Sequence, residues 1–383
     1  MKFVLFYHSL VSDWNHGNAH FLRGIVAELI ARGHRVEVYE PENGWSRRHL
    51  VADHGERAIS EFQRRFPRLR SRTYEPEGFD PAPALDGADV VIVHEWNPPE
   101  LVARIGCERR DRGDFRLLFH DTHHRSATAP AEMAAYDLRD YDGVLAFGGA
   151  VRQRYLEEGW HDSVFTWHEA ADTRVFHPHV RNRLDQQLVW IGNWCDGERA
   201  RELEEYLFGP VRDLQLRATL HGVRYPPQAL EALDDAGISY RGWLPNWRVP
   251  EAFARAALTV HVPRRPYARA LPGVPTIRVF EALACGIPLI CAPWLDSEHL
   301  FEPGTDYLSV QNGDEMRVAL RDVLNDPALA ASLAASGLER IRARHTCGHR
   351  VAELMAIVAA LGAFASAPIP QPAKAAHKET AHA

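Results

Sequence analysis

The sequence predicts an α/β protein built from two doubly wound parallel-sheet domains. Short apolar segments that end in polar residues recur along the chain, and helical patterns separate them, as expected for parallel strands joined by crossover helices. The chain has 383 residues, which is more than one ordinary hydrophobic core accommodates. The alternation breaks once, near residue 179, and then begins again. A composition of 46% hydrophobic and 25% charged residues fits a globular protein.

The first half opens with a strand, a helix and a second strand. Residues 2–7 (KFVLFY) form an apolar run, and residues 34–40 alternate apolar and polar side chains. Between them, Phe21, Ile25 and Leu29 have helical spacing, and Gly33 is expected to end that helix. The same reasoning predicts a helix over 98–110 and strands over 89–95, 115–121 and 141–148.

The second half repeats this pattern after a polar linker at 181–187. Helices are expected over 249–258, 276–286 and 314–345, the last with a break near Pro327. Strands are expected over 187–194, 216–222, 238–244, 258–264 and 288–294. We therefore predict an N-terminal domain (1–178), a C-terminal domain (179–345), a helix that returns to the N-terminal domain (346–364) and a disordered tail (365–383).

Charge and apolar content exclude several classes of protein. A net charge of −7 argues against general nucleic-acid binding. The apolar run at the N-terminus is too short for a signal peptide, and no window reaches the roughly 20 apolar residues of a membrane span. Five dispersed cysteines without a C-x-x-C pair indicate reduced thiols. These observations predict a cytoplasmic protein.

Residues 46–72 form a strongly basic segment with two open interpretations. The first is a solvated helix face and loop. The second is contact with an anionic membrane surface or a lipid-diphosphate acceptor, which would make the protein membrane-peripheral.

The stretch TIRVFEALACGIPLI (276–290) combines an apolar helical stripe with two charged residues. Arg278 and Glu281 lie three positions apart, off the stripe, near the start of the helix. One interpretation is an ion pair on a solvated face. The other is that the Glu281 carboxylate accepts two hydrogen bonds from the hydroxyls of a ribose, while Arg278 and the helix N-terminus favour a phosphate.

The segment FEALACGIPLI resembles the donor-site segment of GT-B nucleotide-sugar glycosyltransferases of the group 1 (family 4-like) type and their spore-maturation-type relatives. Four further segments match this family in order, to about residue 345: YDGVLAFGGAVRQRYLEEGW, VFTWHEAADTRVFHPH, LVWIGNWCDGERARELEEYL and ISYRGWLPNWRVPEAFARAALTVHVPR. The resemblance implies two Rossmann-like domains that face each other across a cleft. It also implies metal-independent transfer of a sugar from a UDP- or GDP-sugar to a hydroxyl acceptor, either lipid-linked or saccharide.

The resemblance assigns donor roles residue by residue. Glu281 takes the ribose position, whereas the upstream sugar-binding Glu of the family is replaced by Gly273. The backbone N–H groups of Gly273 and Val274 can still approach the diphosphate. A diphosphate-binding Arg of the family is replaced by Asn193, while Arg199 keeps the second basic role.

Other donor residues are expected at strand ends. Arg264 and Arg265 follow the strand at 258–264 and can supply the missing positive charge, although a solvated loop pair is the plainer interpretation. His221, Gly222 and Trp243 end strands beside the predicted crevice and are expected to frame the base.

The N-terminal half carries the expected catalytic residues. The resemblance places His120 against the donor sugar and Gly17 in the loop beneath the phosphates. If the reaction inverts configuration, His16 near Asp13 is a candidate general base. A retaining enzyme needs no such base, and retention is the favoured prediction. The H-x-x-H-H spacing from His120 is too loose for a zinc site, so we expect no metal and no cofactor besides the substrate.

Two alternatives stay open from the sequence. A sugar-nucleotide epimerase of the same fold would act on the donor without an acceptor. A non-catalytic GT-B binding or scaffold protein is the other, because family side chains are lost at Gly273 and Asn193.

Overall fold

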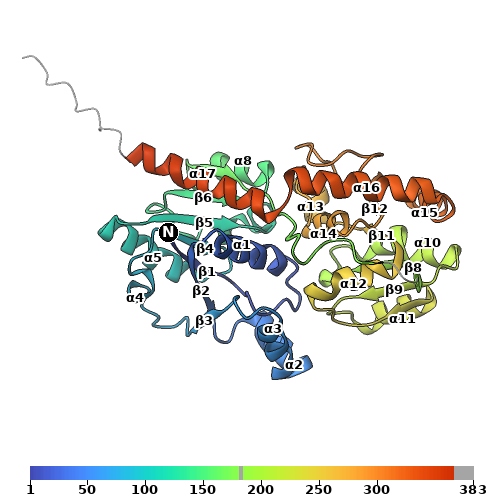
Figure 1. Ribbon diagram of the computed structural model, residues 1–383, viewed down its shortest axis with the longest axis horizontal. Helices are drawn as coiled ribbons and strands as arrows, with labels where there is room; N and C mark the ends of the chain where they lie inside the picture. The colour runs from blue at the N-terminus through green and yellow to red at the C-terminus, as the bar shows by residue number, and fades with distance from the viewer. Residues whose placement is uncertain (181–183, 366–383) are drawn as a thin grey trace, which may run out of the picture.

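The computed structural model describes residues 1–180 and 184–365 of the chain. Part of the predicted linker (181–183) and nearly all of the predicted tail (366–383) lie outside the described residues. The chain forms two halves side by side, each with a parallel sheet covered by helices (Figure 1). The predicted fold class, two doubly wound α/β domains, is thereby confirmed.

The first sheet has seven parallel strands in the order β3-β2-β1-β4-β5-β6-β7. Its centre is apolar and buried on both faces, as expected for parallel strands covered by helices. The strands are β1 (Lys2–Phe6), β2 (Arg35–Pro41), β3 (Ser71–Tyr74), β4 (Val90–His94), β5 (Arg116–Asp121), β6 (Gly143–Ala146) and β7 (Val164–Thr166).

The second sheet has six parallel strands in the order β10-β9-β8-β11-β12-β13. They are β8 (Gln186–Ile191), β9 (Ala218–His221), β10 (Ile238–Tyr240), β11 (Ala256–His261), β12 (Leu289–Cys291) and β13 (Leu308–Ser309). The strand order reverses between β1 and β4 in one sheet and between β8 and β11 in the other. Ligands of open α/β sheets bind at the carboxyl ends of the strands at such reversals.

Helices cover both sheets. In the first half they are α1 (Ala19–Ala31), α2 (Trp45–His54), α3 (Glu56–Arg65), α4 (Ala82–Leu85), α5 (Pro99–Arg112), α6 (Arg125–Thr128), α7 (Pro130–Met133) and α8 (Gly149–Glu157). In the second half they are η1 (Cys195–Gly197), α9 (Ala200–Leu203), the π-helical η2 (Glu204–Phe208), α10 (Gly209–Asp213), α11 (Pro227–Asp235), η3 (Asn246–Arg248), α12 (Val249–Ala254), α13 (Arg265–Ala270), α14 (Ile277–Ala284), α15 (Gly313–Asn325), α16 (Pro327–Arg344) and α17 (Cys347–Ala365). No helix among the described residues is long and apolar enough to cross a membrane.

The last helix, α17, crosses from the C-terminal half to the N-terminal half (Figure 1) and packs against α1. Two backbone hydrogen bonds anchor its start: Ala171 donates to the His345 carbonyl and Cys347 donates to the Ala171 carbonyl, both at 3.0 Å. The indole N–H of Trp167 donates to the carbonyl of Arg350 at 2.8 Å. The connector after β7 and the start of α17 therefore form one joint between the halves.

Several predicted elements differ from the structure. The strands expected over 187–194 and 238–244 end earlier, at Ile191 and Tyr240. Gly242, two residues after Tyr240, has φ +66°, which is outside the extended conformation of a strand. The short strands β3, β7 and β13 were not predicted. All three lie at a sheet edge. Each is held by one neighbouring strand and lacks an apolar pattern of its own that would predict it.

Candidate functional site

The carboxyl ends of the two sheets meet at the junction of the halves. Three contacts between strand-end loops bring them together. The indole N–H of Trp243 donates to Asp13 at 3.1 Å, and the side-chain amide of Asn246 donates to the Gly17 carbonyl at 3.1 Å. Arg264 Nη1 lies 3.4 Å from His123 Nε2. These loops follow β1 and β5 in one sheet and β10 and β11 in the other, so the predicted crevice edges face each other.

Glu281 lies at this junction and is fully buried. His20 Nε2 accepts the backbone N–H of Asp172 at 2.8 Å, so the proton of this ring is on Nδ1 and is donated to Glu281 Oε1 at 3.0 Å. Arg278 donates to the other carboxylate oxygen. A methyl carbon of Ile277 and the guanidinium of Arg278 lie against Gly17. The structure therefore brings together Glu281, Arg278 and Gly17, with His20 from the other half.

Arg199 ties together two loops at the reversal of the second sheet. Its guanidinium donates to the carbonyls of Val262 at 2.9 Å and Asn193 at 2.6 Å and lies over the ring of Trp190. The side chain of Asn193 accepts the backbone N–H of Val223 at 3.0 Å. Arg199 and Asn193 are thus brought together, and both are largely occupied by backbone partners.

Arg264 and Arg265 both donate hydrogen bonds to Glu198, one to its side chain and one to its backbone. Arg264 donates to the Glu198 carboxylate, and Arg265 donates to the Glu198 carbonyl at 2.8 Å. Arg265 also lies 3.2 Å from Glu202. Only Arg264 reaches across to the first half, through His123, so it is the better placed of the two for a ligand between the halves.

Gly273 and Val274 have their N–H groups bonded within the protein. Gly273 donates to the Leu295 carbonyl at 2.6 Å, and Val274 donates to the Leu271 carbonyl at 3.3 Å. Gly273 has φ +84°, and a Cβ there would overlap Glu298. Glu298 therefore occupies the space beside the position where the family carries its upstream Glu.

The residues expected to frame the base lie along one edge of the second sheet. Gly222 donates to the Gly242 carbonyl at 2.9 Å and its backbone is packed against Gly192, so that a side chain at Gly222 would overlap it. His221 Nδ1 has no hydrogen-bond partner within the described protein. Burial, followed by the nearby Arg241 charge, lowers the pKa of His221 to about 4. Trp243 is instead committed to Asp13 across the junction.

Asp13 and His16 are not joined through their side chains. The Asp13 carboxylate accepts from Arg23 at 2.9 Å, from the Trp243 indole at 3.1 Å and from the backbone N–H of Asn246 at 2.9 Å. The contact of His16 with Asp13 is a backbone hydrogen bond, and its ring packs edge-on against His8. Asp13 thus holds the two halves together.

His120 is the second-to-last residue of β5 and is fully buried among aromatic rings. It packs against His94 and Trp167, with ring centroids 5.4 and 4.9 Å away. Neither ring nitrogen has a hydrogen-bond partner within the described residues. Burial lowers the pKa of His120 to about 3, so the imidazole is neutral near pH 7.

Buried polar atoms without a protein partner gather at these strand ends. Such atoms are costly in a folded interior unless a ligand or water satisfies them. Within the described residues, two of them, Ser126 in α6 and Glu202 in α9, lie in short helices. The others lie at or next to strand ends or in the segments that follow strands: His16, Asn18, His120, His123, His124, Arg199, His221, His261, Trp294 and Asp296.

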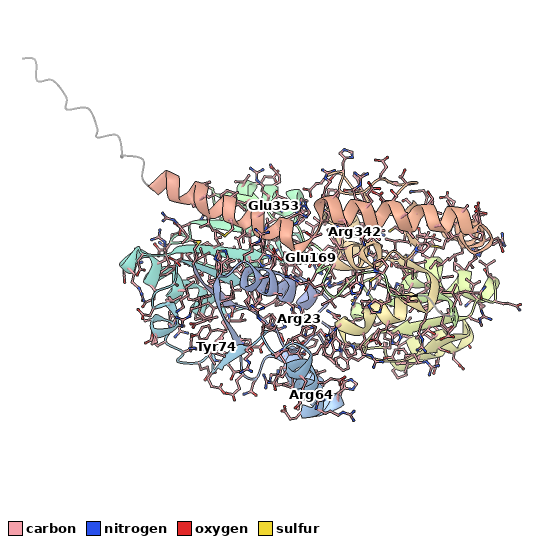
Figure 2. All side chains as sticks on the ribbon, in the orientation of Figure 1. Arg23, Arg64, Tyr74, Glu169, Arg342 and Glu353 are labelled. Carbon is pink, nitrogen blue, oxygen red and sulfur yellow. The ribbon has the colours of Figure 1, made fainter. Side chains whose placement is uncertain are left out.

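The structure adds acidic groups that sequence reasoning missed. Glu95 is buried at the end of β4, where Arg125 binds it at 2.9 Å and the Thr122 N–H donates to it at 2.9 Å. Burial and the Glu95 charge raise the pKa of the neighbouring Asp121. Glu169 lies between the halves (Figure 2), beside Asn18 and the first residue of α14. Its signal in the sequence was slight, a lone carboxyl in an irregular connector.

Comparison with known proteins supports the relationship that the sequence predicts. Residues 199–356 match the family model described as Glycosyl transferase-like. The match covers less than half of the chain and lies mainly in the C-terminal half. The predicted relationship to group 1 glycosyltransferases is confirmed, and the protein is a glycosyltransferase with the GT-B fold. Among curated proteins, no sequence match reaches significance.

Solved structures share the fold of this glycosyltransferase over nearly its whole length. Sucrose-phosphate synthase from Thermosynechococcus elongatus has a TM-score of 0.63 at 15% identity, covering 95% of this chain and 100% of that one. HepE from Anabaena in complex with UDP and glucose has a TM-score of 0.67 at 15% identity, over 93% and 99% of the two chains. An alpha-glucosyltransferase in complex with UDP has a TM-score of 0.68 at 11% identity, over 94% and 100%. At these identities the likeness shows the fold.

Proposed function

We propose that this glycosyltransferase transfers a sugar from a nucleotide-diphospho-sugar to a hydroxyl acceptor, with a UDP-sugar as the first donor to test. The observation that carries the proposal is the gathering of buried, unpartnered polar atoms at the strand ends of both sheets. Buried polar groups need partners, and a nucleotide-sugar offers many hydroxyl and phosphate oxygens. The glycosyltransferase family match and the UDP named for two of the similar structures support this class of ligand.

Glu281 is the proposed ribose ligand. A carboxylate has about four acceptor positions, and His20 and Arg278 engage two of them. Because Glu281 is fully buried, the ribose hydroxyls can reach it only if one of these partners moves aside. Arg278 is the better candidate, since part of its side chain is exposed. A released guanidinium beside the ribose would then pair with the diphosphate.

The diphosphate would be held by basic residues without a metal ion. Arg264 reaches from the second half toward His123 of the first half, and Arg278 lies in the first turn of the helix α14. These two side chains are better placed for phosphate than Arg199, which donates to two carbonyls. Addition of a chelator is therefore expected to leave activity unchanged.

Retention of configuration is the proposed stereochemical course. In that reaction the bond from the anomeric carbon to the leaving phosphate oxygen breaks and a bond to the acceptor oxygen forms on the same face. The acceptor proton passes to the leaving phosphate, so no protein base is required. The commitment of Asp13 to three donors supports this, because it leaves His16 without a carboxylate partner. The neutral His120 ring would contact a sugar hydroxyl.

A donor screen tests the proposed function. Purified protein is incubated with UDP-, GDP- and ADP-sugars, with and without saccharide or lipid-linked acceptors, and released nucleotide and sugar products are measured. Acceptor-dependent release from one donor is the expected result. Epimerised sugar formed without an acceptor would contradict the transferase, and failure of every nucleotide-sugar to raise the melting temperature would favour a scaffold protein.

Glu281→Ala is the variant that tests the donor site. We expect it to fold, with nucleotide binding weakened by about 1.5–3 kcal/mol, because a charge-assisted pair of hydrogen bonds is lost. Glu204→Ala is the matched control, since Glu204 is an exposed carboxylate of the same half paired with Arg212. Nucleotide affinity is measured by calorimetry and folding by circular dichroism. Equal nucleotide affinity of the two variants would show that Glu281 does not bind the nucleotide.

A further inference from the structure

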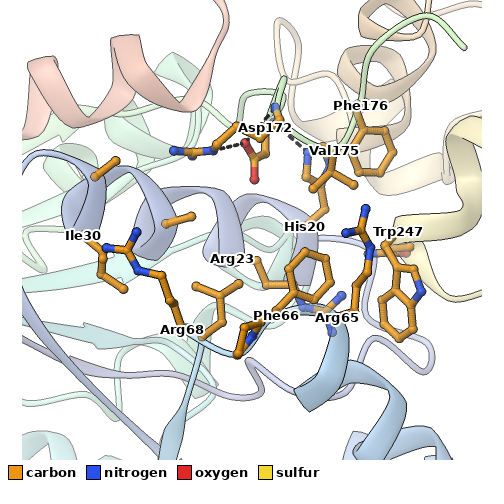
Figure 3. Close-up of a pocket in the computed structure, with 16 residues that line it drawn as sticks. His20, Arg23, Ile30, Arg65, Phe66, Arg68, Asp172, Val175, Phe176 and Trp247 are labelled. Carbon is orange, nitrogen blue, oxygen red and sulfur yellow. Dashed lines mark hydrogen bonds and ion pairs between the residues drawn. The ribbon is translucent and has the colours of Figure 1, made fainter.

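A pocket of about 340 Å³ borders the junction of the halves (Figure 3). It is formed by α1, by the turn after α3, by the connector after β7 and by η3. Its walls are mainly apolar and include Ile30, Phe66, Leu69, Val175, Phe176 and Trp247. A concave apolar site of this size is large enough for a small ligand.

Four arginines and one carboxylate also line this pocket. Two of the arginines are neutralised within the protein. Arg23 pairs with Asp13 at 2.9 Å, and Arg174 pairs with Asp172 at 2.8 Å and with Glu28 at 3.0 Å. Asp172 is the acidic residue of this lining, and its negative charge is paired with Arg174.

The other two arginines, Arg65 and Arg68, have no acidic partner among the described residues. Both are exposed at the rim, and neither guanidinium has a hydrogen bond or ion pair with any residue that the structure describes. The guanidinium of Arg65 lies 5.6 Å from the ring centroid of Phe66. In the view of Figure 3 the two arginines stand on either side of Phe66. The rim therefore carries two positive charges without a protein partner, beside a cavity with apolar walls.

We propose that this pocket binds an amphiphilic anion, a single alkyl chain that carries a carboxylate or phosphate head. The chain would displace water from the apolar walls, which is the favourable term for burial of a hydrocarbon. The head would stay at the rim between Arg65 and Arg68, where guanidinium groups pair with two oxygens at once without full desolvation.

The ligand would also favour the observed arrangement of the halves. Ile30 and Phe66 belong to the first half, while Trp247 belongs to the second. A ligand that contacts both halves binds this arrangement better than one in which they separate, so it shifts the population toward it. This site is independent of the donor proposal, although its wall includes His20, which binds Glu281.

Calorimetric titration of the full chain with decyl phosphate, below its micelle concentration, tests the proposal. One molecule is expected to bind per chain. Decanol, inorganic phosphate and decyltrimethylammonium are each expected to bind at least about ten-fold more weakly, because each lacks the chain or the negative charge. No binding of decyl phosphate, or equal binding of the cationic amphiphile, would overturn the proposal.

Two pairs of substitutions locate the binding. Arg65→Ala with Arg68→Ala is expected to weaken decyl phosphate binding at least about ten-fold. Arg57→Ala with Arg64→Ala removes the same charge from exposed positions of α3 that do not line the pocket, and binding should stay within about two-fold. Ile30→Trp, which fills the cavity without changing charge, should also reduce binding.

The outcomes of these variants separate the pocket from a charged surface. Equal loss in both arginine pairs would overturn the proposal, because it would indicate a diffuse electrostatic effect. Binding only to anionic phosphatidylglycerol vesicles, with both pairs contributing alike, would overturn it too and would indicate contact of α3 with a membrane surface. Circular dichroism of each variant distinguishes lost binding from lost folding.

Discussion

At the scale of single residues, Glu169 illustrates how the junction controls ionisation. Burial raises the pKa of this carboxyl to about 8; the neighbouring Asn18 lowers it and the Glu281 charge raises it further. At neutral pH Glu169 is therefore largely protonated. A neutral carboxyl beside the first turn of α14 can donate a hydrogen bond to a phosphate oxygen, which an ionised one cannot.

Glu169 makes a specific contribution to the pH dependence of stability. Its pKa is raised on folding, so between the unfolded value near 4.5 and the folded value of about 8 the native state binds the extra proton. The Glu169 contribution to the free energy of unfolding should therefore fall as pH rises through this window, by at most about 1.4 kcal/mol per pH unit. Glu169→Gln should lose this component, which urea unfolding of both proteins from pH 5 to 8.5 measures. Parallel curves for variant and wild type would contradict the assignment.

Residue positions were predicted better than residue contacts. Helical spacing placed Arg278 and Glu281 together near the start of one helix, and the structure pairs them. The same pattern suggested an open face, yet Glu281 is fully buried because His20 of the other half covers it. A periodic pattern describes one helix and carries no information on which distant segment packs on it. For this reason His20, Glu169 and Glu298 were not found from the sequence.

At the scale of elements, the packing of α17 on α1 fixes the joint between the halves. Gly24 lies in the middle of α1, and a Cβ at this position would overlap Cys347 Sγ and crowd the Cβ of Asp172. The glycine therefore lets the first turn of α17 approach closely. The sequence predicted both helices from their spacing, but not this contact, which depends on tertiary packing.

Gly24→Ala tests the close approach. An alanine in an ordinary helix position gains about 1 kcal/mol over glycine. Here overpacking should reverse the sign and lower the free energy of unfolding by about 1–3 kcal/mol. Gly106→Ala is the control, because Gly106 is buried in α5 and a Cβ there would lie 3.4 Å from the nearest atom, an ordinary contact. Unfolding in urea compares the two. A gain in stability for Gly24→Ala would contradict the packing described for α1 and α17.

At the scale of the whole molecule, buried histidines shape the response to acid. Burial lowers the pKa of His120, His261 and His345 to about 3 in each case, from an ordinary value near 6.5. These groups stay neutral in the folded protein and take up protons on unfolding below pH 6.5. Their contribution to stability is present above that pH and is lost as the pH falls toward 3.

The histidine contribution to the free energy of unfolding should therefore rise with pH between about 4 and 6.5, by up to about 1.4 kcal/mol per pH unit for each such histidine. Chemical denaturation at constant ionic strength measures the slope. His120→Asn should flatten it by about one proton, if the variant folds. The same slope for His120→Asn and the wild-type protein from pH 4 to 6.5 would contradict the neutral, buried state of His120.

The overall architecture followed from the recurring strand and helix patterns, because parallel sheets with crossover helices leave a regular apolar signature. The position of a bound nucleotide-sugar cannot be predicted from this apolar pattern. The most direct test of the central claim is a crystal structure of the protein with a bound UDP-sugar. We expect the ribose hydroxyls on Glu281, with Arg278 moved to the diphosphate. A complex in which Glu281 still binds both His20 and Arg278 while the nucleotide lies elsewhere would contradict the account.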